Sequence, residues 1–159
     1  MIKTLNIGEK EVVLDNNIGW TLIYKDQFGE DILPAIMPML VSGLDIIAGI
    51  FEESEDKNNI TIESLAKVVD SDKFTSALFH SSAFEFTTCL NIIWSLAKNA
   101  DESIPEPKRW LRGFDEFPLD VIGVEAVKLI FKGMVSSKNQ QRMNELMESV
   151  HPKKKTPSK

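Results

Sequence analysis

The side chains that could carry out acid–base or metal chemistry are few and scattered. His80 and His151 are the two histidines, and neither has a cysteine or second histidine at the spacing of a zinc site. Ser81 and Ser82 follow His80, but no Gly-x-Ser-x-Gly sequence would present either serine as a nucleophile. Ser82 also fits the structural role of a helix N-cap. We therefore expect no catalytic site and no metal site in this protein.

Three further features could bind a ligand or react. Asp45 lies in an apolar segment and could be a functional buried carboxylate, although a position facing solvent or a neighbouring donor explains it better. The acidic run 52–56 lacks the spacing of a calcium loop, which favours a solvated loop. Cys89 lies on the inner face of an expected helix, where it reads as a small core residue. The eight glycines occur singly and form no phosphate loop, so we expect no cofactor.

The balance of charge limits the possible partners. The chain has 159 residues and a net charge of −6. Without the four lysines at 153–155 and 159, it has 14 basic and 24 acidic side chains, a net charge of −10. So acidic a body repels phosphate backbones, and we expect no nucleic-acid partner. The single cysteine excludes an internal disulfide and favours a reducing cytosol, and no segment has the pattern of a signal peptide.

One segment is long and apolar enough to form a membrane-spanning helix. Residues 32–51, "ILPAIMPMLVSGLDIIAGIF", reach the length of a spanning helix. Asp45 at mid-depth would cost roughly 2.5–3.5 kcal/mol, and acidic residues flank both ends. Pro34 and Pro38 also weaken a continuous helix. We predict that this helix is buried in a core or in a subunit contact and does not span a membrane.

The spacing of apolar residues predicts a mainly α fold: a single helical domain of about five to six helices, residues 1–150, with a small N-terminal β-hairpin. The hairpin covers residues 2–14 and turns at Gly8-Glu9-Lys10. Trp20, Tyr24 and Phe28 then recur every fourth residue on a short helix that stops at Gly29. The basic tail 151–159 is expected to be disordered.

The remaining helices follow from capping signals and periodicity. Asp31 can cap a helix that either kinks at Pro38 or starts afresh from it. Ser82 and Glu85 form a capping-box pattern at the start of a central helix. Ile92 and Trp94 lie off the main apolar face of this helix, so we expect it to be covered on two sides. The expected helices are 32–51, 60–70, 83–98, 119–134 and a polar one with Met143, Leu146 and Met147. The stretch 71–86 is ambiguous, with one turn at 74–79.

Aromatic residues gather in the broken stretch "EPKRWLRGFDEFPLD", residues 106–120. Trp110 and Phe114 have the spacing of one helical turn, and Pro118 can open the next helix. These residues could form a partner site or close a hydrophobic core, and we favour the core role. A domain of this size cannot surround both 32–51 and 119–134 completely, so some apolar surface should face another chain. The candidate partner-binding residues are Trp110, Phe114, Phe117, Val124, Val127 and Phe131.

The order of these segments resembles the tail assembly chaperones of long-tailed, siphovirus-type bacteriophages, particularly those of Gram-positive hosts. The resemblance covers almost the whole length. An N-terminal β segment precedes "GWTLIYKDQFGEDIL", a hydrophobic helix and an acidic loop. The helix "FEFTTCLNIIWSLAKNAD", the link "IPEPKRWLRGFDEFPLD" and an apolar helix ending in "SSKNQQRMNELMES" follow.

The resemblance implies a non-enzymatic protein. Such chaperones keep the tape measure protein soluble and help tail tube subunits polymerise around it, in the host cell cytoplasm and not in the mature virion. It also implies that the run Lys153-Lys154-Lys155 could mark a programmed frameshift that yields a longer product. The alternative is a structural tail or head-completion subunit of the virion, and self-association is compatible with either. The family supplies no agreed ligand residues.

Overall fold

A computed structural model describes residues 1–53, 60–81 and 85–134. Within these ranges the chain forms a two-stranded hairpin followed by seven helices, which confirms the mainly α fold with an N-terminal hairpin. Two short helices, in the ambiguous stretch and in the aromatic link, raise the count above the expected five to six. The expected polar helix near Met143 and the tail 151–159 lie outside the described residues.

The hairpin forms where the sequence predicted it. Strands β1 (Ile2–Ile7) and β2 (Lys10–Asp15) pair antiparallel, with Ile7 opposite Lys10. Gly8 has a φ of 61°. A positive φ at the first central position suits a two-residue hairpin turn, because the twist of such a turn matches that of the strands. Ile7, Val12 and Leu14 are buried on one face, so the hairpin is half core and half surface.

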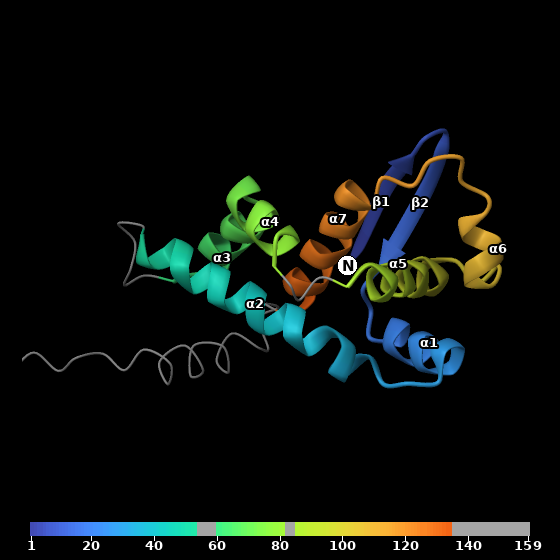
Figure 1. The fold of residues 1–159 in the computed structure, drawn as a ribbon, viewed down its shortest axis with the longest axis horizontal. Helices are drawn as coiled ribbons and strands as arrows, with labels where there is room; N and C mark the ends of the chain where they lie inside the picture. The colour runs from blue at the N-terminus through green and yellow to red at the C-terminus, as the bar shows by residue number, and fades with distance from the viewer. Residues whose placement is uncertain (54–59, 82–84, 135–159) are drawn as a thin grey trace, which may run out of the picture.

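Helix α1 (Gly19–Phe28) and helix α5 (Phe86–Ala100) complete the first half of the molecule. Trp20 and Tyr24 are buried, and the Phe28 ring lies 5.8 Å from the Trp94 ring on α5. Helix α5 packs on β2 on one side and α1 on the other, which confirms the expected burial on two sides (Figure 1). Gly29, with a φ of 77°, ends α1 in the left-handed conformation that favours glycine.

The predicted capping box of α5 is wrong. The helix begins at Phe86, and Glu85 is its N-cap with an extended backbone, φ −94° and ψ 120°. A residue with those angles cannot occupy the third helical position that the capping box requires. The Glu85 carboxylate instead accepts a hydrogen bond from the Thr88 hydroxyl at 2.8 Å. Ser82 lies outside the described residues.

Helices α2 (Ile32–Glu52), α3 (Ile62–Val69) and α4 (Asp72–Phe79) make the second half. The Asp31 side chain caps α2 by accepting from the Leu33 amide at 2.9 Å, and α2 continues through Pro38 as one helix. The predicted single turn at 74–79 is a two-turn helix, because the Ser71 hydroxyl accepts from the Phe74 amide and starts it earlier.

Helix α7 (Leu119–Met134) contacts both halves, α5 on one side and α3 and α4 on the other. Figure 1 shows it between the α2–α4 group and the hairpin. The Phe131 ring lies 5.5 Å from the Phe74 ring in an edge-to-face arrangement and fits against Gly43 of α2. Pro118 precedes α7 and its carbonyl accepts from the Val121 and Ile122 amides, as the sequence predicted for the start of this helix.

Candidate partner-binding groove

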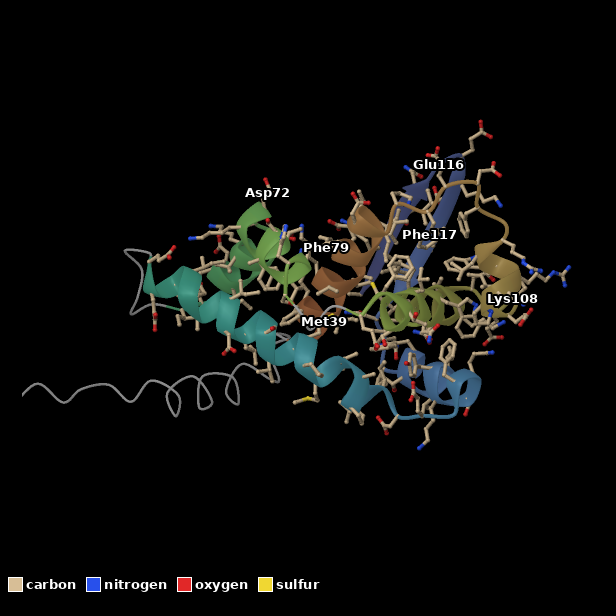
Figure 2. The ribbon with its side chains drawn as sticks, in the orientation of Figure 1. Met39, Asp72, Phe79, Lys108, Glu116 and Phe117 are labelled. Carbon is tan, nitrogen blue, oxygen red and sulfur yellow. The ribbon has the colours of Figure 1, made fainter. Side chains whose placement is uncertain are left out.

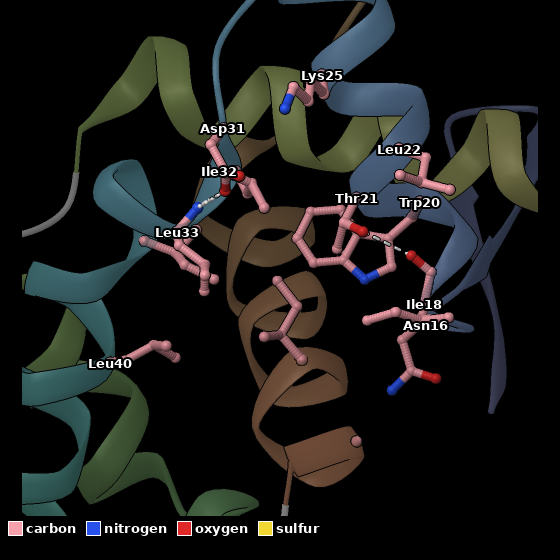
Figure 3. Close-up of a pocket in the computed structure, with 13 residues that line it drawn as sticks. Asn16, Ile18, Trp20, Thr21, Leu22, Lys25, Asp31, Ile32, Leu33 and Leu40 are labelled. Carbon is pink, nitrogen blue, oxygen red and sulfur yellow. Dashed lines mark hydrogen bonds between the residues drawn. The ribbon is translucent and has the colours of Figure 1, made fainter.

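An open groove of about 580 Å³ lies between α1 and α2. Figure 3 shows α7 between the two helices, with Leu22 on the α1 wall and Leu33 on the α2 wall. Ile130 and Gly133 of α7 also line it. The groove therefore exists only because α7, which is distant in the sequence, packs against the two consecutive helices α1 and α2. We define the α1–α2 groove by these lining residues: Asn16, Ile18, Trp20, Thr21, Leu22, Lys25, Asp31, Ile32, Leu33, Ile36, Leu40, Ile130 and Gly133.

Large apolar side chains on the groove walls are left in solvent. Ile18 is 76% exposed, Leu22 65% and Leu33 57%. Met37 and Val41 are also exposed and continue the Leu33 row along α2 at four-residue intervals. These five make up more than half of the nine large exposed hydrophobics in the described part of the chain. Single exposed hydrophobics are ordinary, but a row on facing helices is the kind of surface that binds another chain.

The polar groups around the groove are mostly engaged within the chain. Asn16 donates to the Leu129 carbonyl at 2.6 Å, and the Thr21 hydroxyl donates to the Ile18 carbonyl at 2.8 Å. The Asp31 carboxylate is taken by the α2 cap. Such a groove recognises a ligand by shape and apolar contact more than by directed hydrogen bonds. It matches the mode in which the apolar face of an amphipathic helix lies in a groove.

Trp110, Phe114 and Phe117 form one aromatic cluster around helix α6 (Pro107–Leu111). Their ring centroids are 5.0 to 6.0 Å apart and meet edge to face, and all three are partly buried against the core. Figure 2 shows Phe117 above α5, between α6 and α7, while Lys108 points outward. This packing is what the core interpretation expects. A partner-binding role for the cluster stays a prediction.

Two backbone contacts join the aromatic link to the rest of the fold. The Trp94 indole N–H donates to the Pro105 carbonyl at 2.9 Å, which holds the link against α5. Lys10 at the hairpin turn donates to the Gly113 carbonyl, and its ammonium lies 5.1 Å from the Phe114 ring centroid. The link is therefore held by α5 just before its start and by the hairpin near its middle.

The three candidate residues on α7 lie elsewhere. Val127 and Phe131 are buried in the core, and Val124 is half-buried. The structure thus separates the six predicted partner residues into an aromatic cluster beside the hairpin and a row along α7. Neither set lines the α1–α2 groove.

The sequence analysis missed the groove residues. Ile18 and Leu22 are four residues apart on the side of α1 opposite its Trp20–Tyr24 stripe, and that second apolar spacing was the available signal. The Leu33–Met37–Val41 row was present within an almost wholly apolar segment. No periodicity distinguished its exposed side from its buried one.

The residues that could react or bind a ligand lie apart from one another. Burial raises the pKa of the Cys89 thiol to about 12, which suppresses its reactivity. His80 caps the C-terminal end of α4, with Nδ1 2.7 Å from the Ser76 carbonyl oxygen. Asp45 is exposed on α2. In the described ranges no three histidine, cysteine or acidic side chains are grouped so that they could hold a metal ion.

Helix α2 is long and apolar enough to cross a membrane, and 33% of its most apolar window is buried inside the chain. A core helix and a membrane span both pass this test of length and composition. The exposed part of α2 includes one wall of the groove, so a protein contact accounts for its apolar surface as well. The absence of a membrane partner stays a prediction.

Comparison with protein-family models, with curated proteins and with solved structures found no match to this chain.

Proposed function

We propose that this protein is a phage tail assembly chaperone that acts without catalysis in the host cell cytoplasm. In this role it binds the tape measure protein, keeps it soluble and promotes tail tube polymerisation around it, and it is absent from the mature virion. The proposal is supported by the resemblance in segment order and by the α1–α2 groove. The groove is the observation that carries it, because a chaperone for long helical clients needs an apolar surface open to solvent.

The groove suits an amphipathic client helix. A helix that lays an apolar stripe against Ile18, Leu22 and Leu33 would remove from water side chains that are now more than half exposed. Each such side chain, when fully covered, contributes roughly 1.5–3 kcal/mol. Several contacts of this size give useful affinity after the cost of association is subtracted.

The acidic body suits the same role. The net charge of −6 makes copies of the protein repel one another. The same repulsion favours the solubility of a complex in which the protein covers a client. The groove therefore supplies the contact, and the remaining surface supplies solubility.

Co-expression with the tape measure protein of the same phage tests the proposal. We expect the wild-type chain to move the tape measure protein from the pellet to the soluble fraction and to co-purify with it. The double substitution Leu22→Asp/Leu33→Asp should abolish both effects, because it places two carboxylates in the groove.

Val121→Asp is the matched control. Val121 lies on α7 and is 57% exposed, the same fraction as Leu33, but it does not line the groove. This variant should behave as wild type. A failure of the wild-type chain to solubilise or co-purify with the tape measure protein contradicts the proposal. Detection of the chain in purified virions by mass spectrometry would favour the alternative, a structural tail or head-completion subunit.

A further inference from the structure

We propose that residues 138–150 of this same chain dock in the α1–α2 groove when no client is bound. The docking itself requires no client, whereas its consequence for client binding rests on the proposed function. Three observations support it: where α7 ends, the spacing of apolar residues in 138–150, and the charges of the two parts.

Helix α7 ends beside the groove. Gly133 lines the groove and α7 finishes one residue later, at Met134, so the following residues start from this place. Met143 lies ten positions after Gly133. An extended link to residue 138 spans up to about 17 Å, and a helix from 138 to 143 adds about 7.5 Å. The α2 residues that line the groove end at Leu40, about 12 Å of helix from Ile32, so Met143 is within reach of them.

The apolar residues of 138–150 have the spacing of a helix that is apolar on one side. Met143, Leu146, Met147 and Val150 follow the pattern i, i+3, i+4, i+7, and polar or charged residues fill the positions between them. This is the pattern by which an amphipathic helix engages a groove. Methionine is flexible and polarisable and so adapts to an irregular apolar surface.

Charge favours this segment over a second copy of the chain. Residues 135–159 have six basic and two acidic side chains, a net charge of +4. Residues 1–134 have twelve basic and twenty-two acidic side chains, a net charge of −10. Asp26 and Glu30, near the groove at the end of α1, are exposed. Residues 138–150 are themselves neutral, and the charge of +4 lies in the lysines of the tail 151–159 that follows them. This tail is attracted to the acidic body and holds the neighbouring segment near it, while two whole chains, each at −6, repel one another.

Tethering makes the contact effective even when it is weak. A short link holds the segment at an effective concentration in the millimolar range, so a modest intrinsic affinity is enough for occupancy. The segment would cover Ile18, Leu22 and Leu33 and would yield only to a client that binds more tightly. The groove would then be shielded from unspecific partners.

Disulfide trapping in the full-length protein without any client tests the docking. In a Cys89→Ala background, the pair Leu22→Cys/Met147→Cys should form an intrachain disulfide under mild oxidation in dilute solution. The pair Val121→Cys/Met147→Cys is the control, because Val121 is exposed outside the groove. We expect the groove pair to close at least tenfold faster, as read from mobility on non-reducing gels and from peptide mass spectrometry.

The other outcomes overturn the proposal. Equal rates for the two pairs would show that 138–150 does not dock, and a concentration-dependent interchain disulfide would assign the groove to a second copy. A dye test that keeps Cys89 provides an independent measurement. Met143→Asp/Met147→Asp should raise the fluorescence of an apolar dye several-fold over wild type, and adding Leu22→Asp should reverse the rise. No rise in the first variant contradicts the docking.

Discussion

Two glycines of α2 differ in the space available for a side chain, although both lie in the same helix. A Cβ atom built on Gly43 would lie 2.1 Å from Cζ of the Phe131 ring, whereas one on Gly49 has nothing within 4 Å. Phe131 is buried and held edge to face against Phe74, so it has little room to move. Gly43 is therefore a packing requirement that joins α2 to α7, while Gly49 only lowers helix propensity.

This difference predicts opposite effects of the same substitution. Gly43→Ala should lower the free energy of unfolding by about 1–3 kcal/mol because it overpacks the core. Gly49→Ala should raise it by about 0.5–1 kcal/mol because alanine favours the helix. Urea unfolding of the two variants and wild type measures both changes, and equal effects at the two sites would contradict the packing of α2 on α7.

Cys89 should be nearly inert in the folded protein. Its pKa is raised from 9.0 to about 12 by burial, so at pH 8 its thiolate fraction is about a thousandfold below that of a free thiol. We predict that iodoacetamide labels the native protein at least a hundredfold more slowly than the urea-unfolded chain. Similar rates would show that α5 is not packed on both sides as described.

The same shift gives a direction to the pH dependence of stability. Because the folded-state pKa is raised, the stabilisation from the neutral thiol is complete below about pH 9 and is lost as the pH rises toward about 12. Burial also raises the pKa of Tyr24, which acts in the same direction at alkaline pH.

At the scale of elements, helix α6 and its aromatic cluster behave as a closing piece of the core. Trp110 contacts Phe114 and Phe117 edge to face, and the cluster is bounded by the hairpin and α5. Trp110→Ala should therefore lower the free energy of unfolding by about 2–4 kcal/mol through loss of buried contacts. Thermal and urea unfolding measure the loss, and co-purification with the client should be unchanged under conditions where the variant is folded. Intact stability together with lost client binding would reverse this assignment.

The sequence predicted most elements but not how they face one another. Trp20, Tyr24 and Phe28 showed α1, Gly8 showed the hairpin turn, and Pro118 showed where α7 begins, because each signal acts within a few residues. Glu85 misled the prediction, because the Ser-x-x-Glu pattern does not determine the backbone angles, and Glu85 is extended and precedes the helix. The groove could not be predicted, because Leu22, Leu33 and Ile130 come together only through the packing of α1, α2 and α7.

At the scale of the whole molecule, an acidic protein bears an apolar groove at the junction of its two halves. The hairpin, α1 and α5 pack on one side of α7, and α2, α3 and α4 on the other, with the groove between α1 and α2. Helix α2 contributes both to the core and to the exposed wall, which explains why its composition is apolar on nearly all sides. In the proposed function this junction is where the client is held.

Site-specific photo-cross-linking during co-expression with the tape measure protein tests the central claim most directly. A benzophenone amino acid would replace Leu22 or Leu33 in the groove, and Phe86 or Val121 as exposed apolar controls. The account predicts a cross-link to the tape measure protein from the two groove positions and none from the controls. Cross-links from the control positions alone, or from no position while the client is soluble, would contradict the assignment of the groove as the client site.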